Sequence, residues 1–295
     1  DEISDDSESP LGDPTDVLMT YKSISILFED MKGLVFDKMA NDTIVDFYLS
    51  LLAQEEVPPS IQVSTHVFSC FFYKRLTAGI DAGNTNYIWG EKAAGVRFDT
   101  VERNYESISK WTKDVDIFRK DYVVIPVVDD LHWYLIIIII KPYKCIVPYS
   151  ADIPIDERSN RKGFIESGDF ATYAVILDSL YQEYDPKRQA TIHLIRDYLE
   201  LEYVRKKGKA NDGKVFDRSR IGVLRSKGLP QQKNSTDCGF YMLKYAETLL
   251  AQPPCQELLR HGVRWSEWYE GFELSVRTVR RNIAEAIRWR TDKKV

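Results

Sequence analysis

The chain has 295 residues, of which 44% are hydrophobic and 29% charged, and its formal net charge is −5. This mixture can bury a sizeable core and excludes a disordered, collagen-like or low-complexity protein. The negative charge argues against a nucleic-acid partner, because nucleic-acid-binding proteins usually carry a basic surface. The longest aliphatic run, Leu135–Ile140, is much shorter than the roughly 20 residues of a membrane-spanning helix, so we expect no membrane partner.

Cysteine usage indicates the compartment and the absence of cofactors. Cys70, Cys145, Cys238 and Cys255 are too few and too scattered for a disulfide framework or a metal cage, so we expect no metal and no cofactor. A reducing, intracellular compartment fits best, because no signal peptide opens the chain. The chain begins with Asp1, and we interpret it as a piece excised from a longer protein.

Charge is distributed unevenly between the two ends. Residues 1–16 hold seven acidic residues and no basic one, which predicts a disordered acidic tail. The stretch Arg277–Lys294 holds seven basic residues against two acidic ones. We interpret this basic stretch as the solvated face of a helix. Neither end by itself indicates a function.

Two apolar, β-branched runs form the clearest structural pattern. Tyr122–Val128 and Trp133–Ile140 flank a short polar turn, which predicts a hairpin of buried strands. Tyr173–Leu177 predicts a third buried strand, and residues 223–224 predict a weak one. Helical spacing of apolar residues predicts helices over residues 43–52 with Asn41 or Asp42 as N-cap, 66–76, 186–205, 240–250 and 265–289, with some helix among the loops of 78–110.

Two polar segments interrupt this pattern. Residues 141–170 are rich in Pro, Lys, Asp, Ser and Gly, and residues 205–220 are basic and polar, so both predict insertions. Because they interrupt the elements that carry the candidate site residues, we expect their tips near the rim of the site. Strands and helices interleave without an internal repeat. The sequence therefore predicts one mixed α+β domain over residues 17–295, in which a central mixed sheet is flanked by helices.

Cys238 is the most informative candidate for chemistry. It lies between a polar loop and an apolar helix, where the positive end of the helix dipole favours a thiolate. Gly239, which follows it, permits close approach of another segment. A buried structural cysteine is an equally good interpretation of Cys238 from its position alone. The other three cysteines lack this setting and are interpreted as structural.

A cysteine nucleophile needs a base and a residue that orients the base. His132 opens a buried strand, and Asp178 ends another, so both stand at sheet edges. Gln232 lies six residues before Cys238 and could donate its amide to an oxyanion. Each residue also has an ordinary interpretation, such as a turn or cap aspartate or a loop glutamine. The ordered set nevertheless points to nucleophilic catalysis.

Several longer motifs then resemble one family. The sequence resembles the Ulp/SENP cysteine proteases, which cleave the ubiquitin-like modifier SUMO from its targets. The block Pro230–Gly239, with the sequence PQQKNSTDCG, is the most specific match. The remaining matches are His132-Trp133, Leu177–Leu180, Asn41-Asp42 with Asp46–Tyr48, Phe68–Thr77 and Trp111–Phe118. The last two blocks and the insertion between His132 and Asp178 resemble the branch that prefers poly-SUMO chains.

The resemblance implies a papain-like-superfamily protease domain and a role for each motif residue. It implies that His132 is the general base, Asp178 its orienter, Cys238 the nucleophile and Gln232 the oxyanion donor. Trp133 would form one wall of a tunnel for the Gly-Gly terminus of the modifier, which selects residues without side chains. Two further substrate-binding candidates lie where the family has an aromatic residue followed by Leu-Asn-Asp, namely Met39 and Asp42.

The resemblance also implies SUMO and SUMO-conjugated proteins as partners, a nuclear location and a monomer. Three alternatives remain open at this point. The chain could be a protease for another Gly-Gly modifier such as NEDD8, because the catalytic residues would look the same. It could be an acyltransferase with a similar catalytic set, although the Gln232 spacing and Trp133 argue against this. It could also be a non-catalytic SUMO-binding scaffold that keeps the fold.

Overall fold

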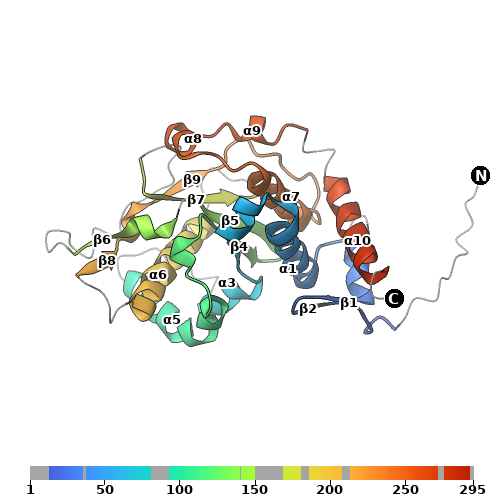
Figure 1. Ribbon diagram of the computed structural model, residues 1–295, viewed down its shortest axis with the longest axis horizontal. Coiled ribbons are helices and arrows are strands. Elements are labelled where there is room, and N and C mark those ends of the chain that lie inside the picture. The colour runs from blue at the N-terminus through green and yellow to red at the C-terminus, as the bar shows by residue number, and fades with distance from the viewer. Residues whose placement is uncertain are drawn as a thin grey trace, which may run out of the picture.

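A five-stranded mixed sheet with helices on both sides forms the centre of the molecule (Figure 1). The computed structural model describes residues 13–35, 38–80, 93–139, 141–149, 169–180, 186–207, 213–271 and 276–292. In these residues the order of the strands across the sheet is β3-β4-β5-β7-β9. Their bounds are β3 Thr65–Val67, β4 Tyr122–Asp129, β5 His132–Ile139, β7 Thr172–Leu177 and β9 Ile221–Arg225.

The predicted hairpin is the middle of this sheet. Strand β5 pairs antiparallel with both β4 and β7, whereas β3 and β9 run parallel to their neighbours at the two edges. The run of isoleucines in β5 is buried throughout because both faces of the sheet are covered. Alternate side chains therefore enter two different cores: Trp133, Leu135, Ile137 and Ile139 on one face, and Tyr134, Ile136 and Ile138 on the other.

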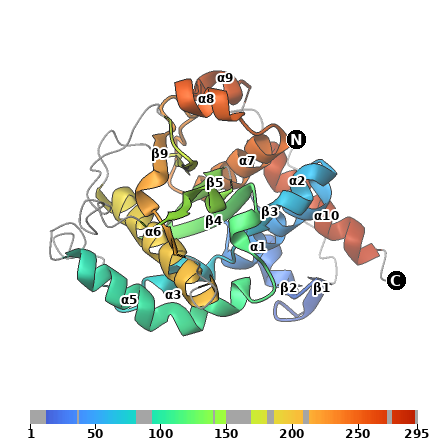
Figure 2. The ribbon, with the colours of Figure 1, turned by 60° about the vertical axis from the view of Figure 1, so that its left-hand side comes forward.

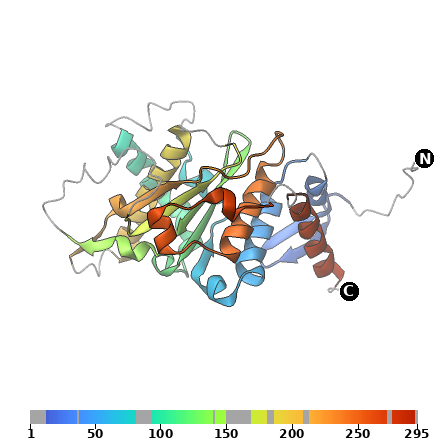
Figure 3. The same cartoon turned by 90° about the horizontal axis from the view of Figure 1, so that it is seen from above.

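Helices from both halves of the chain cover the two faces. Figure 2 and Figure 3 show α3, α5 and α6 on one side of the sheet and α1, α7 and α10 on the other. Two small two-stranded sheets, β1–β2 and β6–β8, lie at opposite ends of the molecule (Figure 1). The bounds of these elements are α1 Asp42–Leu51, α2 Pro59–Ser64, α3 Phe71–Leu76, α5 Ala93–Ile108, α6 Pro186–Lys207, α7 Cys238–Ala251, α8 Gln256–His261, α9 Trp265–Trp268, α10 Val276–Asp292, β1 Val17–Tyr21, β2 Ile24–Leu27, β6 Ile146–Pro148 and β8 Lys214–Phe216.

Most predicted elements form within a few residues of their expected bounds, but the first part of one predicted helix is wrong. Residues 66–76 were expected to be helical, yet residues 65–67 form strand β3, and α3 begins only at Phe71. Pairing with β4 overrides the local helical spacing, because residues 65–67 satisfy their backbone groups by hydrogen bonds to that strand. The region 265–289 divides into α9 and α10, and residues 1–12 lie outside the described part of the chain.

The described flanks of the two insertions pair with each other as strands β6 and β8. They lie at the end of the sheet opposite His132, since β5 begins at His132 and β6 follows its far end. Seven strand intervals of about 3.3 Å separate His132 from Ile139 by roughly 23 Å. The described flanks, residues 141–149 and 213–216, thus lie away from His132, whereas the expectation concerned the tips of the two insertions. The segments 150–168 and 208–212 lie outside the described residues.

Replacement of Ile137 tests the central position of β5. This side chain is fully buried in one core, so Ile137→Ala should lower the free energy of unfolding by about 2–5 kcal/mol through lost contacts and the cavity left behind. Chemical denaturation would measure the change. Val63→Ala, at a side chain that is 74% exposed, is the matched control and should change it by less than about 0.5 kcal/mol. Equal effects of the two substitutions would contradict the placement of Ile137.

Candidate active site

Three chain segments meet where β5 begins, β7 ends and α7 begins. Cys238 is the first residue of α7, is buried and follows the loop that contains Gln232. His132 opens β5, and Asp178 directly follows the last residue of β7. Because β5 and β7 are antiparallel, with Leu135 opposite Leu177, these two ends lie at the same edge of the sheet. The structure therefore brings His132, Asp178 and Cys238 together.

A tight turn with an unusual backbone delivers His132 to this edge. Asp129 pairs with His132 across the turn, and the two residues between them, Asp130 and Leu131, have φ values of 49° and 63°. This left-handed region is unfavourable for residues other than glycine, by about 1 kcal/mol or more each. Leu131 is also 80% exposed. The two-residue turn thus fixes the register in which His132 enters the sheet.

The histidine interacts with a carboxylate and with the thiol. His132 Nε2 lies 2.6 Å from Asp178 Oδ1, and the Leu180 backbone N–H donates to the same oxygen at 2.9 Å. Cys238 acts on the same imidazole and helps to raise its pKa. His132 is thus placed between a carboxylate and a thiol, which is the arrangement that a general base of a cysteine nucleophile needs.

The charges of this set favour a protonated histidine. Burial lowers the pKa of His132, but the hydrogen bond with Asp178 and the negative charges of Asp178 and Cys238 outweigh burial and raise this pKa to about 9. Burial also raises the pKa of Asp178, yet the hydrogen bond with His132 and the charge of Arg188 outweigh it, so the pKa falls below its ordinary value. Both pKa shifts therefore indicate an imidazolium beside a carboxylate.

Gln232 is held in the loop before Cys238 by bonds to two other residues. Its Oε1 accepts a hydrogen bond from Ser179 Oγ at 2.5 Å, and its backbone N–H donates to the Ser179 carbonyl at 3.1 Å. Its Nε2 donates to the Asn234 carbonyl at 2.6 Å. Ser179 follows Asp178 directly, so the glutamine is tied to the strand end that carries the carboxylate. The second hydrogen on Nε2 is the one that the predicted oxyanion contact would use.

Trp133 packs against the start of α7. Its Nε1–H donates to the Ala40 carbonyl at 3.2 Å, and the side chain is buried. A Cβ added to Gly239 would lie 2.9 Å from the Ala40 Cβ and 3.3 Å from Trp133 Cδ1. The close approach predicted for Gly239 is therefore confirmed. Met39, next to Ala40, is 36% exposed.

The second substrate-binding candidate, Asp42, is the first residue of α1. Burial and the negative charge of Asp46 raise its pKa, which the Lys74 charge partly offsets. The Asn41 side chain caps the helix by accepting from the Ile44 backbone N–H at 3.0 Å, which decides between the two predicted N-caps. Asp42 thus lies near two charged residues, Asp46 of its own helix α1 and Lys74 of α3.

A buried arginine of the C-terminal helix holds the segment before Cys238, and sequence analysis missed it. Arg280 is only 6% exposed, although the basic stretch around it was expected to be a solvated helix face. Its guanidinium donates to the backbone carbonyls of Gly33, Val35 and Lys38 at 3.2, 2.7 and 2.8 Å. It also bonds Asp237 Oδ1 at 2.5 Å.

The interpretation of a solvated helix face is therefore wrong at Arg280, because a guanidinium with this many acceptors can be buried. Its carbon also lies 3.7 Å from the Phe240 ring centroid. The one sequence signal for this burial is the helical spacing of Val276, Val279, Ile283 and Ile287, which places Arg280 on the apolar stripe and Arg281 beside it.

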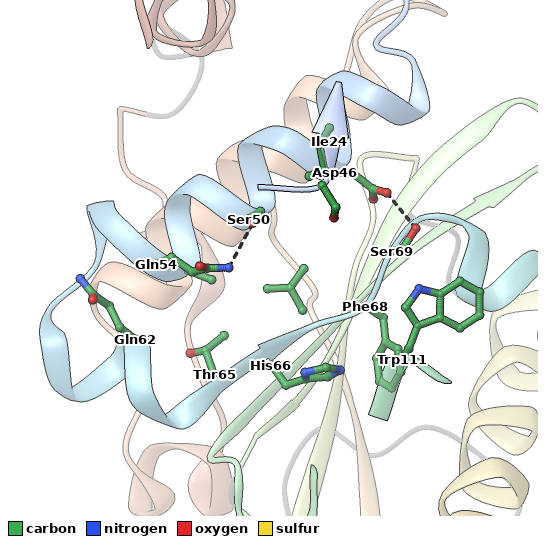
Figure 4. A pocket seen from close by; sticks show the side chains of 13 residues that line it. Ile24, Asp46, Ser50, Gln54, Gln62, Thr65, His66, Phe68, Ser69 and Trp111 are labelled. Atoms are coloured by element: carbon green, nitrogen blue, oxygen red, sulfur yellow. Dashed lines mark hydrogen bonds between the residues drawn. The ribbon is translucent and has the colours of Figure 1, made fainter. Parts of the chain in front are cut away.

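A cavity of about 670 Å³ lies away from this set, beside the edge strand β3 (Figure 4). Its walls include Asp46, which accepts from Ser69 Oγ at 2.8 Å, and His66 of β3. His66 Nε2 is buried and has no hydrogen-bond partner among the described residues. Burial lowers the pKa of His66 to about 4, so this histidine is neutral near pH 7 and does not belong to the charged set around Cys238.

Comparison with known proteins identifies the family. Residues 38–264 match the family described as Ulp1 protease family, C-terminal catalytic domain. The chain belongs to the Ulp1 protease family. This confirms the resemblance that the motifs around His132, Asp178 and Cys238 indicated, and it places the chain among cysteine proteases.

Curated relatives and solved structures agree with this assignment. The chain is 28% identical over 285 residues to the probable ubiquitin-like-specific protease 2A of Arabidopsis thaliana, which covers 94% of this chain and 31% of that protein. It is 31% identical over 247 residues to ubiquitin-like-specific protease 2 of Schizosaccharomyces pombe, with coverage of 78% and 34%. Human sentrin-specific protease 7 is 27% identical over 282 residues, with coverage of 83% and 25%. The chain thus spans about a third or less of the length of these relatives.

The solved structures support the fold. The C-terminal Ulp1 protease domain in complex with the yeast SUMO ortholog Smt3 superposes with a TM-score of 0.53 at 21% identity, covering 93% of this chain and 88% of that one. The crystal structure of a de-sumoylating protease gives a TM-score of 0.59 at 18% identity, with coverage of 92% and 88%. The predicted α+β fold with a central mixed sheet is therefore confirmed.

Replacement of Arg280 tests whether the C-terminal helix supports the nucleophile. Arg280→Met removes the donors that hold Asp237, so we expect the free energy of unfolding to fall by about 3 kcal/mol or more. The alkylation rate of Cys238 by iodoacetamide should change as well, because the first turn of α7 loses its anchor. Arg281→Met, whose side chain is 68% exposed, is the control. Unchanged stability and unchanged alkylation in Arg280→Met would show that Asp237 needs no such anchor.

Titration of His132 tests the charged state of the set. NMR of labelled histidine should show this ring losing its proton near pH 9, and Cys238→Ala should bring that value down. A histidine whose pKa is raised on folding adds stability that is complete below its ordinary value near 6.5 and disappears as pH rises through about 9. The stability difference between the native chain and His132→Ala should therefore shrink over that window. Titration of His132 near pH 6.5 would contradict the charged pairing.

Proposed function

We propose that the chain is a thiol isopeptidase that removes SUMO from conjugated proteins by cleaving after the Gly-Gly terminus of the modifier. The observation that carries the proposal is the assembly of His132, Asp178 and Cys238 at one edge of the sheet, in a chain of the Ulp1 protease family. The names of the relatives support the substrate, since they are proteases specific for ubiquitin-like proteins or sentrin.

The chemistry follows from the placement of these residues. Cys238 Sγ attacks the carbonyl carbon of the terminal glycine, and a C–S bond forms as the carbonyl π pair moves to oxygen. The Gln232 amide and the Cys238 backbone N–H donate to this oxyanion. When the oxyanion collapses, the C–N bond breaks, and the His132 imidazolium gives its proton to the departing lysine amine.

Hydrolysis of the thioester completes the cycle. His132, now neutral, takes a proton from water as the water oxygen attacks the same carbonyl carbon. The C–S bond breaks and the thiolate–imidazolium pair is restored. The modifier leaves as a carboxylic acid, which gives the second proton of the water to solvent and becomes the C-terminal carboxylate. Asp178 keeps the imidazole in the orientation that both transfers need and stabilises its charged form, without taking the proton itself.

Substrate selection in this proposal rests on the segment around Trp133. Its buried ring and the side chain of Ala40 pack closely on Gly239, the residue after Cys238. A narrow passage along this ring would admit only residues without side chains. We propose Met39 as the opposite wall, because it adjoins Ala40 and is partly exposed. Asp42 would contact the body of the modifier through its carboxylate.

The similarity to sentrin-specific protease 7 and ubiquitin-like-specific protease 2 supports a preference for poly-SUMO chains. A nuclear location and action as a monomer are proposed from the family resemblance of the motifs alone. A protease for another Gly-Gly modifier remains the alternative, because the set around Cys238 would serve either modifier. We propose residues 17–295 as the protease domain.

Active-site labelling tests the proposal. A SUMO vinyl sulfone should label the native chain at Cys238, and Cys238→Ala should lose both labelling and cleavage of di-SUMO while keeping SUMO binding, because only the nucleophile is removed. Cys255→Ala is the control, since Cys255 is the exposed cysteine and should keep near-native activity.

Three outcomes would distinguish the proposed function from its alternatives. Labelling by a NEDD8 probe in preference to the SUMO probe would replace the substrate. SUMO binding without labelling by the native chain would mean a binding scaffold. Cleavage of di-SUMO at the same rate as a mono-SUMO reporter would remove the chain preference while keeping the isopeptidase activity.

A further inference from the structure

The carboxylate that orients His132 has a second partner, which the mechanism above does not use. Arg188, in the first turn of α6, donates from Nε to Asp178 Oδ2 at 2.8 Å. The other oxygen, Oδ1, accepts from His132 Nε2 and from the Leu180 N–H. The two edges of the carboxylate are therefore occupied by cations on opposite sides, the histidine on one and the arginine on the other.

Arg188 is itself held firmly in place. Its guanidinium carbon lies 3.8 Å from the ring centroid of Tyr134, and its Nη1 lies 3.8 Å from Asp129 Oδ2. The Tyr134 hydroxyl is in turn hydrogen bonded to Thr191 Oγ1 at 2.8 Å, one turn along α6 from Arg188. The side chains of Arg188 and Asp178 are 12% and 7% exposed, so water screens their interaction weakly.

We propose that Arg188 is a positioning residue of this active site, which aims the Asp178 carboxylate at His132 and offsets part of its negative charge. The inference rests on the proposed cysteine-protease function. Without Arg188, Asp178 would face His132 with its full charge and one oxygen unpaired. The planar guanidinium, stacked on Tyr134, donates from Nε to Asp178 Oδ2 in a fixed direction that the flexible ammonium of a lysine does not reproduce.

This arrangement has a predictable effect on pH dependence. Removal of one positive charge from a cluster makes every acid in it harder to deprotonate, so formation of the Cys238 thiolate and loss of the His132 proton both move to higher pH. The charged or titratable groups that face Asp178, Arg188 or His132 come from five elements and the turn between β4 and β5. They are Asp129 of β4, Asp130 of the turn, His132 and Tyr134 of β5, Tyr73 of α3, Lys187 of α6, and Cys238 and Tyr245 of α7. None of them replaces the Arg188 charge, because Lys187 is paired with Asp130.

The test compares three variants by the pH dependence of Cys238 alkylation in a Cys255→Ser background. The label is read on the Cys238 peptide by mass spectrometry, because Cys70, Cys145 and Cys238 are all buried and burial does not distinguish them. In a plot of the alkylation rate against pH, Arg188→Gln should shift both the acidic and the basic limb of the curve to higher pH by about 0.5–1 unit. Arg188→Lys keeps the charge and should leave the limbs near their native positions. In cleavage of di-SUMO, however, Arg188→Lys should lower kcat several-fold, because the rigidly placed Nε–H donor that orients Asp178 is lost.

The matched control is Arg218→Gln, which breaks another buried pair involving α6. Arg218 bonds Asp197, and the side chains of that pair are 13% and 2% exposed, closely similar to those of Arg188 and Asp178. Arg218→Gln should destabilise the fold without moving either limb. If the alkylation curves of Arg188→Gln and Arg218→Gln had their limbs at the same pH values, the proposal would be overturned. Full kcat in Arg188→Lys would overturn its positioning part, and this holds even if Arg188→Gln does not fold.

Failure of the proposed function gives a different result. If the native chain cleaves no modifier but its Cys238 alkylation limbs shift in Arg188→Gln, the isopeptidase assignment falls and the role of Arg188 in the charged set stands. If the native chain cleaves di-SUMO and the limbs of Arg188→Gln coincide with the native ones, the isopeptidase assignment stands and the role of Arg188 falls.

Discussion

The antiparallel pairing of β5 with β7 is the constraint on which the candidate site depends. It places the first residue of one strand beside the residue that follows the other, and so brings His132 within 2.6 Å of Asp178 across 46 residues of sequence. A shift of one residue in this register would turn each inward side chain of β5 to the other face. Both faces are buried, so such a shift would disrupt two cores at once. The hydrophobic core thereby fixes the geometry of a polar site.

Buried charges around the site are satisfied by partners from distant parts of the chain. The carboxylate of Asp178 has His132 on one side and Arg188 on the other, whereas Asp237 is held by Arg280. A buried charge without partners costs several kcal/mol, so each of these pairs constrains both of its members. The loop that precedes Cys238 is fixed at one end to the strand that carries Asp178, through Ser179 and Gln232, and at the other to α10. The position of the thiol therefore depends on residues from β7 to the C-terminal helix.

The central hairpin and strand β7 were predictable because their signals are local, whereas His132, Asp178 and Cys238 were indicated by their order at element ends and by the family motifs around them. A run such as Trp133–Ile140 has no helical period, and a cysteine before an apolar helix stands out by its position. The edge strand β3 could not be predicted, since its three residues become a strand only by pairing with β4. Arg188 and Arg280 were missed for a related reason. Arginine on a charged helix is usually solvated, and the tertiary contacts with Tyr134 or Phe240 distinguish these two.

The far ends of the molecule play different parts in this arrangement. The hairpin β1–β2 and helix α10 lie side by side at one end, and Arg280 connects that end to Asp237 beside Cys238 (Figure 1). At the other end, the ribbon of β6 and β8 joins the flanks of both insertions, and β5 separates it from His132 by roughly 23 Å at about 3.3 Å per residue. A partner bound at the ribbon itself could not touch the thiol. It could act on the site only through the sheet, or by holding a second part of a long substrate at that distance, which is the geometry that increases the affinity for chains over single units.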